Sequence, residues 1–306
     1  MTNHIINQGV KALIRTFCIG KLITPGYHPS TSSIKSASQS DIQVYSISVT
    51  MKLVLFIMFV ATACARTSSN RTAPITDGPQ ERIVNGYNAY EGKAPYAVGL
   101  RMNNGAVGAG SVIGNTWVLT AAHCLTTESL TIHYGSNRAW NGQIQHTVSK
   151  ENFFRHPGFG NSAGHDIGLI RTPHVDFTNL INKVALPTFS QQGERFENWW
   201  TVACGWGGLG DGNLANWLQC MDVQIISNNE CARFYGSVAS TDMCTRATDG
   251  KSTCGGDSGG ALVTHDNPIQ VGVIAFGSVG CKSAPSGYTR VSDHLDWIRE
   301  KSGIAY

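Results

Sequence analysis

The sequence has few charged residues and few prolines. Only 14% of its 306 residues are Asp, Glu, Lys or Arg, and only 10 are proline, whereas 34 are glycine. A disordered chain, a collagen-like repeat and a coiled coil each need a strong compositional bias, and a chain with 42% hydrophobic and 9% aromatic residues does not have one. We therefore expect a folded protein with enough residues to bury a sizeable core.

The larger part of the chain, residues 83–306, also lacks an excess of positive charge. Residues 1–82 contain 8 Lys and Arg against 3 Asp and Glu, whereas residues 83–306 contain 15 against 17. The net charge of +3 therefore comes from the first part of the chain. Binding to a nucleic acid needs a basic surface, so we expect no nucleic-acid partner.

The apolar run at residues 53–60 is too short to cross a membrane, because a spanning helix needs about 20 apolar residues. Lys52 precedes this run, and the small residues Ala63-Cys64-Ala65 follow it. This order is typical of a secretory signal peptide with its cleavage site; the alternative is a buried core helix. We therefore predict a signal peptide at residues 51–65, a secreted protein and no membrane partner.

Residues 1–50, which precede this signal, are polar and show no periodic pattern. Because a signal peptide belongs at the N-terminus, we interpret them as an upstream gene-model extension, with translation beginning at Met51. The alternative is a membrane-retained form. A tryptic peptide spanning residues 36–52 in the unprocessed protein would contradict our interpretation. After the signal, residues 66–82 are polar and contain proline and glycine, which favours an exposed linker.

Three short segments after residue 82 each contain a residue type that nucleophilic catalysis needs. His123 follows a strand-like segment, Asp166 opens an apolar run, and Ser258 lies in the segment Gly255-Gly256-Asp257-Ser258-Gly259-Gly260. A serine hydroxyl needs a base to become a nucleophile, and a carboxylate fixes the tautomer of an imidazole base. Glycines on both sides of the serine let N–H groups point at a developing oxyanion.

Each signal alone has a structural explanation, such as a core histidine, a capping aspartate or a glycine-rich loop. Together, in the order His, Asp, Ser with separations of 43 and 92 residues, they are far more specific. Further segments accompany them at residues 82–86 (RIVNG), 94–96 (APY), 199–208 (WWTVACGWGG), 285–288 (PSGY) and 295–306 (LDWIREKSGIAY). With these motifs, residues 83–306 resemble the chymotrypsin-like (trypsin-fold) serine peptidases, and most closely the Jonah-type digestive serine proteases of insects.

The resemblance implies an all-β fold of two antiparallel six-stranded β-barrels with a C-terminal helix and the active site in the cleft between the barrels. It makes His123 the general base, Asp166 its orienting partner and Ser258 the nucleophile. The backbone N–H groups of Gly256 and Ser258 form the oxyanion hole. The apolar spacing after Ser292 also favours a final helix, and the residues on its apolar face are Val291, Leu295 and Ile298.

The resemblance also implies synthesis as a zymogen. Arg82 followed by Ile83 matches the family's activation cut, so residues 66–82 are the expected activation propeptide and residues 83–306 the peptidase domain. The new amino group of Ile83 is expected to pair with Asp257. The implied partners are protein or peptide substrates, an activating trypsin-like peptidase and protein inhibitors. We expect a monomer that uses no cofactor.

Specificity depends on Ser252, which stands six positions before the nucleophile Ser258. Trypsin-like members have an aspartate at this position. A neutral residue there leaves a buried Lys or Arg side chain unpaired, which is costly. Gly277 keeps the neck of the pocket open, whereas Ser286 replaces a glycine usual at the rear wall and makes the pocket shallower. We predict a chymotrypsin-like preference for large apolar or aromatic residues, with an elastase-like preference as the alternative.

Seven cysteines follow residue 82, and in a secreted protein an odd count leaves one unpaired. The resemblance pairs Cys231 with Cys244 and Cys254 with Cys281. Cys204 and Cys220 lack the partners used in other members, but they flank a segment whose two arms are expected to form a hairpin. Facing positions in a hairpin have Cβ atoms within about 4.5–5.5 Å, close to disulfide reach, so we pair these two.

Cys124 remains as the odd thiol, because Gly108 stands where the family usually has its partner cysteine. It is either a buried, inert thiol or a reactive thiol, since a neighbouring imidazolium such as that of His123 lowers a thiol's pKa.

The rival class is a non-catalytic peptidase homologue that only binds partners, and the intact triad argues against it. We predict no metal site, because the sequence has no CxxC or HExxH spacing for zinc and residues 131–146 contain no Asp or Glu for calcium. The expected role and location are digestion in the gut lumen.

Overall fold

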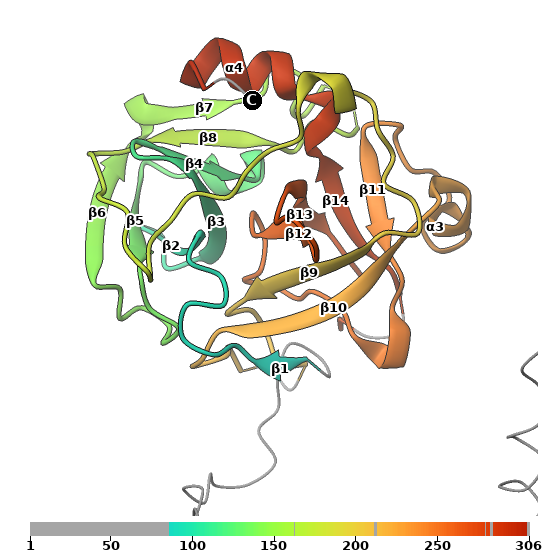
Figure 1. Ribbon diagram of the computed structural model, residues 1–306, viewed down its shortest axis with the longest axis horizontal. Helices are drawn as coiled ribbons and strands as arrows, with labels where there is room; N and C mark the ends of the chain where they lie inside the picture. The colour runs from blue at the N-terminus through green and yellow to red at the C-terminus, as the bar shows by residue number, and fades with distance from the viewer. Residues whose placement is uncertain (1–85, 162, 211–212, 279, 282–283, 305–306) are drawn as a thin grey trace, which may run out of the picture. The chain divides into compact units, whose positions relative to one another are not determined.

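Two antiparallel β-sheets make up most of the structure (Figure 1). The computed structural model describes residues 86–304 except 162, 211–212, 279 and 282–283. The predicted upstream extension, signal peptide and propeptide, together with Arg82 and Ile83, lie outside the described residues.

The first sheet has seven strands in the order β6-β5-β2-β3-β4-β8-β7 and is curled. Its side chains alternate between core and surface, as pleated strands require: in β5, Leu130, Ile132 and Tyr134 are buried and the residues between them are partly exposed. Its strands are β2 (Ala97–Met102), β3 (Val107–Gly114), β4 (Trp117–Thr120), β5 (Ser129–Tyr134), β6 (Ile144–Ser149), β7 (Phe153–Arg155) and β8 (Gly168–Arg171).

The second sheet closes into a six-stranded barrel, because β9 pairs with both β10 and β12. Inward-facing apolar side chains such as Met221, Leu262 and Tyr288 fill its interior, as in other small barrels. β1 (Tyr87–Asn88) adds to the outside of β10. The barrel strands are β9 (Trp200–Gly205), β10 (Gln219–Ile226), β11 (Asp242–Thr245), β12 (Ala261–Thr264), β13 (Gln270–Phe276) and β14 (Ser286–Arg290).

The predicted all-β class and antiparallel pairing are confirmed. The first sheet differs in detail from the expected six-stranded barrel: it has seven strands, and within the described residues its edge strands β6 and β7 do not pair with each other. β7 has only three residues, none of them buried, so it offers little pairing surface to close a ring.

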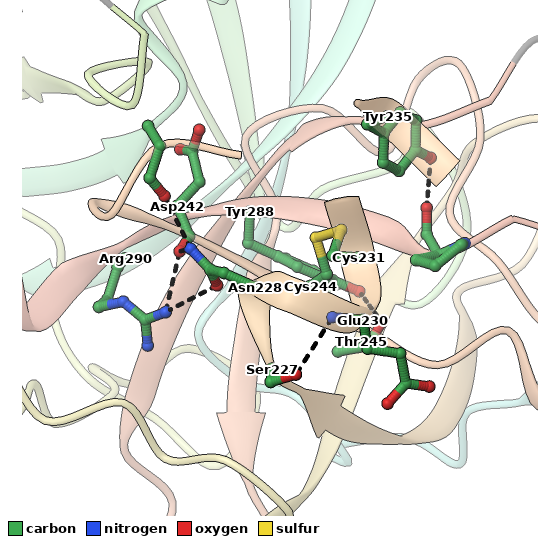
Figure 2. Close-up of a disulfide and its surroundings, with 12 residues drawn as sticks. Ser227, Asn228, Glu230, Cys231, Tyr235, Asp242, Cys244, Thr245, Tyr288 and Arg290 are labelled. Atoms are coloured by element: carbon green, nitrogen blue, oxygen red, sulfur yellow. Dashed lines mark hydrogen bonds between the residues drawn. A yellow bond between two sulfur atoms is a disulfide. The ribbon is translucent and has the colours of Figure 1, made fainter. Parts of the chain in front are cut away.

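The two α-helices of the described residues lie on the outside of the sheets (Figure 1). α3 (Asn228–Tyr235) begins after Ser227, whose hydroxyl accepts a hydrogen bond from Glu230 N, and a disulfide joins Cys231 on this helix to Cys244 on β11 (Figure 2). α4 (Leu295–Ser302) is the predicted final helix, and it lies beside β8 with Leu295 and Ile298 buried. Short 3-10 helices are η1 (Ala122–Leu125), η2 (Lys150–Asn152), η3 (Phe189–Gln191), η4 (Thr248–Gly250) and η5 (Val291–Asp293).

Within the part of the chain described here, no helix combines the length and the apolar character that crossing a membrane requires.

Candidate active site

The pairing of β4 with β8 brings His123 and Asp166 together, although 43 residues separate them in sequence. Thr120, the last residue of β4, lies opposite Gly168, the first residue of β8. His123 follows β4 in η1, where its neighbours Ala122 and Cys124 are buried while its own side chain stays 38% exposed. The apolar residues around His123 therefore fix η1 in the core and leave the imidazole accessible.

Asp166 binds His123 through both carboxylate oxygens. One oxygen lies 2.6 Å from His123 Nδ1, and the other accepts the backbone N–H of His123 at 2.9 Å. Burial of the ring is the largest single effect and opposes its protonation, but the hydrogen bonds and charges of Asp166 and Cys124 together outweigh it and raise the pKa of His123 to about 10. The carboxylate thus fixes the ring orientation and favours the imidazolium.

Ser258 lies in a loop in which two glycines have backbone conformations that favour glycine. Gly256 and Gly259 have φ angles of +97° and +87°. A Cβ on Gly259 would lie 2.1 Å from Thr120 Oγ1, so this loop packs directly against the end of β4. The carbonyl of Ser258 accepts the N–H of Ala109 at 2.8 Å and the thiol of Cys124 at 3.5 Å. These contacts place the loop next to η1, which carries His123.

Two backbone N–H groups of this loop are unpaired. Within the described residues, neither Gly256 N nor Ser258 N donates to an acceptor. Unpaired, fixed N–H groups beside a nucleophile are suited to stabilise an oxyanion.

Asp257 turns away from this loop into the interior and is fully buried. Its carboxylate accepts N–H groups from Gly207 at 2.7 Å and Cys254 at 2.9 Å. Burial raises the pKa of Asp257 to about 6, although these two hydrogen bonds act in the opposite direction. A Cβ on Gly207 would lie about 2.5 Å from the carboxyl group, which explains the glycine of the Gly205-Trp206-Gly207 tract.

The predicted pocket residues lie on neighbouring segments of the second barrel. Ser252 and Ser286 are buried, and both hydroxyls bind backbone groups: Ser252 Oγ donates to Cys281 O, and Ser286 Oγ accepts the N–H of Thr253 at 2.9 Å. A Cβ on Gly277 would meet only Thr253 O, at 3.9 Å, so this position leaves open space.

Among the described residues the structure has three disulfides, and they are the expected pairs: Cys204–Cys220, Cys231–Cys244 and Cys254–Cys281. Cys204 and Cys220 are directly opposite each other in the β9–β10 pair, as the hairpin argument required. Cys124 is a buried free thiol, and a Cβ on Gly108 would lie 3.1 Å from its sulfur. Such disulfides are typical of extracellular proteins.

Sequence reasoning missed two features around this site. Thr289 of β14 donates its hydroxyl to Asp166 O at 3.1 Å, which ties Asp166 to the second barrel. Three histidines, at positions 156, 165 and 294, have ring nitrogens within 4.8 Å of one another. Their spacing matches no short motif, because His294 comes 129 residues after His165.

A closed antiparallel barrel beside a curled β-sheet, with an Asp–His pair next to a glycine-flanked serine, defines a serine peptidase. The trypsin family model matches residues 83–298. This chain belongs to the trypsin family of serine endopeptidases, and protein or peptide chains are its substrates.

Several relatives support this assignment. Serine protease 1 of Drosophila melanogaster is 51% identical over 76% of this chain and 90% of the relative. A collagenase of Hypoderma lineatum is 36% identical over 82% of this chain and 99% of its own length. A chymotrypsin of Phaedon cochleariae is 33% identical over 73% of this chain and 83% of its own length. A solved collagenase structure aligns with a TM-score of 0.67 and 35% identity over 73% of this chain and all of that chain.

Proposed function

We propose that Ser258 is the nucleophile, that His123 is the general base, and that Asp166 orients and stabilises the His123 ring. His123 removes the hydroxyl proton as Ser258 Oγ attacks the scissile carbonyl, and later returns a proton to the leaving amine. The N–H groups of Gly256 and Ser258 bind the resulting oxyanion. The observation that carries this proposal is the pair of hydrogen bonds between Asp166 and His123, next to the loop that contains Ser258.

A fluorophosphonate probe tests these roles, because it labels only an activated serine. Activated protein is expected to react at Ser258, and Ser258→Ala and His123→Ala are expected to abolish labelling. Ser190→Ala, at an exposed serine, is the control and keeps full labelling. Labelling that persists in Ser258→Ala would disprove the assignment, and no labelling of the activated wild-type protein would favour the rival non-catalytic homologue.

We infer that the protein is secreted as a zymogen and activated by a cut after Arg82. The supporting observation is the buried Asp257 carboxyl, which has two N–H donors but no cation partner in the part of the chain that the structure describes. A new amino group at Ile83 supplies a positive charge that favours ionisation of this carboxyl.

The test is Arg82→Gln, which prevents cleavage by a trypsin-like activator and is expected to leave the protein inactive after treatment with that activator. Arg82→Lys keeps a basic residue for cleavage and serves as the matched control. Full activity of uncut Arg82→Gln would disprove activation by this cut.

For specificity we propose cleavage after Phe, Tyr, Leu or Met, with little cleavage after Lys or Arg. Ser252 provides no negative charge, and its hydroxyl and that of Ser286 already bind backbone groups. The substrate pocket therefore favours an apolar side chain. An elastase-like preference for smaller residues is the alternative, because Ser286 narrows the rear wall.

A peptide library, read at the residue before each cut, distinguishes these preferences. Ser252→Asp is expected to improve cleavage after Arg, but the improvement should be partial, because other loops also contribute to specificity. Ser190→Asp, at an exposed position, should not improve cleavage after Arg. Efficient hydrolysis of an Arg amide by the wild-type protein would overturn the proposal.

We further propose a digestive role in the gut lumen, like that of the Jonah-type proteases, with protein inhibitors as partners and a monomeric active form. The three disulfides and the predicted signal at residues 51–65 support secretion. Sequencing of the N-terminus of the secreted and activated protein is expected to begin at Ile83, with residues 1–82 absent.

A further inference from the structure

His156, His165 and His294 form a compact cluster on the side of the fold where α4 begins. The rings of His156 and His165 are stacked, with centroids 4.7 Å apart, and both meet the ring of His294 edge-on at 5.1 and 5.3 Å. His294 is 3% exposed, whereas His156 and His165 are partly exposed. The cluster is therefore rigid on one side and open to solvent on the other.

The hydrogen bonds of His294 fix which of its nitrogens has a free lone pair. Its Nδ1 lies 2.7 Å from the carbonyl oxygen of Arg290, so Nδ1 carries the proton and Nε2 the lone pair. That lone pair faces His165 Nδ1 at 3.1 Å. A backbone carbonyl that holds the second ring nitrogen is the usual partner of a metal-binding histidine, because it fixes the tautomer and the orientation of the ring.

The other two rings also supply lone pairs. His156 uses Nδ1 as a hydrogen-bond acceptor, so this nitrogen carries a lone pair. Its Nδ1 accepts an N–H bond from Gly158 at 3.1 Å, which a metal would replace; Gly158 is only partly buried, so water can take over its N–H. His165 binds through Nδ1 once its own proton moves to Nε2.

We propose that His156, His165 and His294 bind one Zn²⁺ ion. Imidazole nitrogen is a preferred zinc ligand, and three histidines leave a fourth position for water. Ligand nitrogens in a tetrahedral zinc site lie roughly 3.4 Å apart when each Zn–N bond is about 2.0–2.1 Å. The present separations are 3.1 Å for one pair and no more than 4.8 Å for the others. Because an imidazole lone pair lies in the plane of its ring, the stacked rings of His156 and His165 rotate on binding until their lone pairs converge on the ion, and both side chains are partly exposed.

Calorimetric titration of zinc-free protein with ZnCl₂ at pH 7.5 tests the proposal, on a Ser258→Ala background that prevents self-digestion. We expect one saturable site per chain. Loss of a residue that only hydrogen-bonds to a metal ligand weakens metal binding by roughly 10- to 100-fold. His156→Asn and His165→Asn each remove a ligand itself, so each should weaken zinc binding by more than this. His294 is left unchanged, because its burial makes a folding defect in its variants difficult to separate from loss of a ligand.

Two controls separate this site from other zinc-binding histidines. His174→Asn changes an exposed histidine that is paired with Asp176, and His123→Ala removes the histidine of the proposed active site. Both are expected to keep the wild-type dissociation constant. Absence of a saturable site, an unchanged constant in His165→Asn, or loss of the site in His123→Ala would each overturn the proposal.

Discussion

At the residue scale, Gly259 shows how closely the nucleophile loop approaches the first sheet. Its φ of +87° already favours glycine, and an added Cβ would lie 2.3 Å from Ala109 O as well as 2.1 Å from Thr120 Oγ1. Gly105 has the same φ of +87° but no atom within 4 Å of its virtual Cβ. Substitutions at these two glycines therefore distinguish the cost of backbone strain, which both share, from the cost of overpacking, which arises only at Gly259.

We predict that Gly259→Ala lowers the free energy of unfolding by more than Gly105→Ala does. Both changes place alanine at positive φ, which costs about 1–2 kcal/mol, and Gly259→Ala adds an overpacking cost of about 1–3 kcal/mol. Urea denaturation of both variants in the Ser258→Ala background measures the difference. Equal destabilisation would mean that the loop moves away from Thr120 without cost.

Asp242 is a second residue whose surroundings have a measurable consequence (Figure 2). Its carboxyl is buried, and burial together with the charge of Asp166 raises its pKa to about 7, against the opposing effect of Arg290. Arg290 donates to the Asp242 backbone carbonyl at 2.8 Å.

We predict that this carboxyl destabilises the fold as the pH rises from about 4 to about 7. In that interval the folded state keeps a proton that the unfolded state, with an ordinary pKa near 3.9, has lost. The free energy of unfolding therefore falls by up to about 1.4 kcal/mol per pH unit from this group. Asp242→Asn should remove this contribution.

Thermal or urea unfolding of the Ser258→Ala protein across this pH range checks the slope. Asp266→Asn, at an exposed position, is the control and should leave the slope unchanged. A pH dependence that is identical with and without Asp242 would rule out its role.

At the element scale, strand β3 and helix η1 meet at Gly108 and Cys124 without a covalent bond. The virtual Cβ of Gly108 lies 3.1 Å from the sulfur of Cys124, and it also lies 3.1 Å from Ser258 O and 3.2 Å from Met102 Cε. A disulfide requires the Cβ of one cysteine to lie about 3 Å from the sulfur of the other, which follows from ordinary bond lengths and angles.

We predict that Gly108→Cys forms a disulfide with Cys124 and raises the free energy of unfolding. A loop of about 15 residues is stabilised by about 3 kcal/mol in the chain-entropy estimate, less the cost of displacing Met102. Peptide mapping without reduction identifies the bond, and urea denaturation measures its effect. Gly108→Ser, similar in size but unable to form the bond, is the control; two free thiols in Gly108→Cys would contradict the prediction.

Local elements were the part of the fold that the sequence predicted best. The spacing of Cys204 and Cys220 indicated the β9–β10 hairpin, and the apolar spacing of Leu295 and Ile298 indicated α4, because both patterns depend on neighbours in sequence. The shape of the first sheet depends instead on whether distant edge strands pair. The histidine cluster was missed for the same reason, since only the folded chain brings His294 to His165.

At the scale of the whole molecule, the covalent crosslinks are unevenly distributed. All three disulfides join residues between 204 and 281, in the second barrel and its connections. The first sheet, which positions His123 and Asp166, has no disulfide within the described residues. It is held by apolar packing, including side chains such as Leu100, Leu119 and Ile170 that are completely buried.

We predict that backbone amides in β2–β8 exchange with deuterium faster than those in β9–β14. Crosslinks reduce the freedom of the unfolded chain and so oppose opening of the second barrel, whereas the first sheet opens against packing alone. Hydrogen exchange of the Ser258→Ala protein, followed by mass spectrometry of peptides, measures both regions. Slower exchange in the first sheet would contradict the prediction.

This uneven distribution has a consequence for how long an enzyme of this kind survives among other peptidases. Attack begins where the chain opens locally, and the half without crosslinks opens most readily. A single nick between η1 and Asp166 would leave His123 and Asp166 on separate fragments. The working lifetime of the molecule is then decided by its uncrosslinked half, while the three disulfides protect the half that carries Ser258.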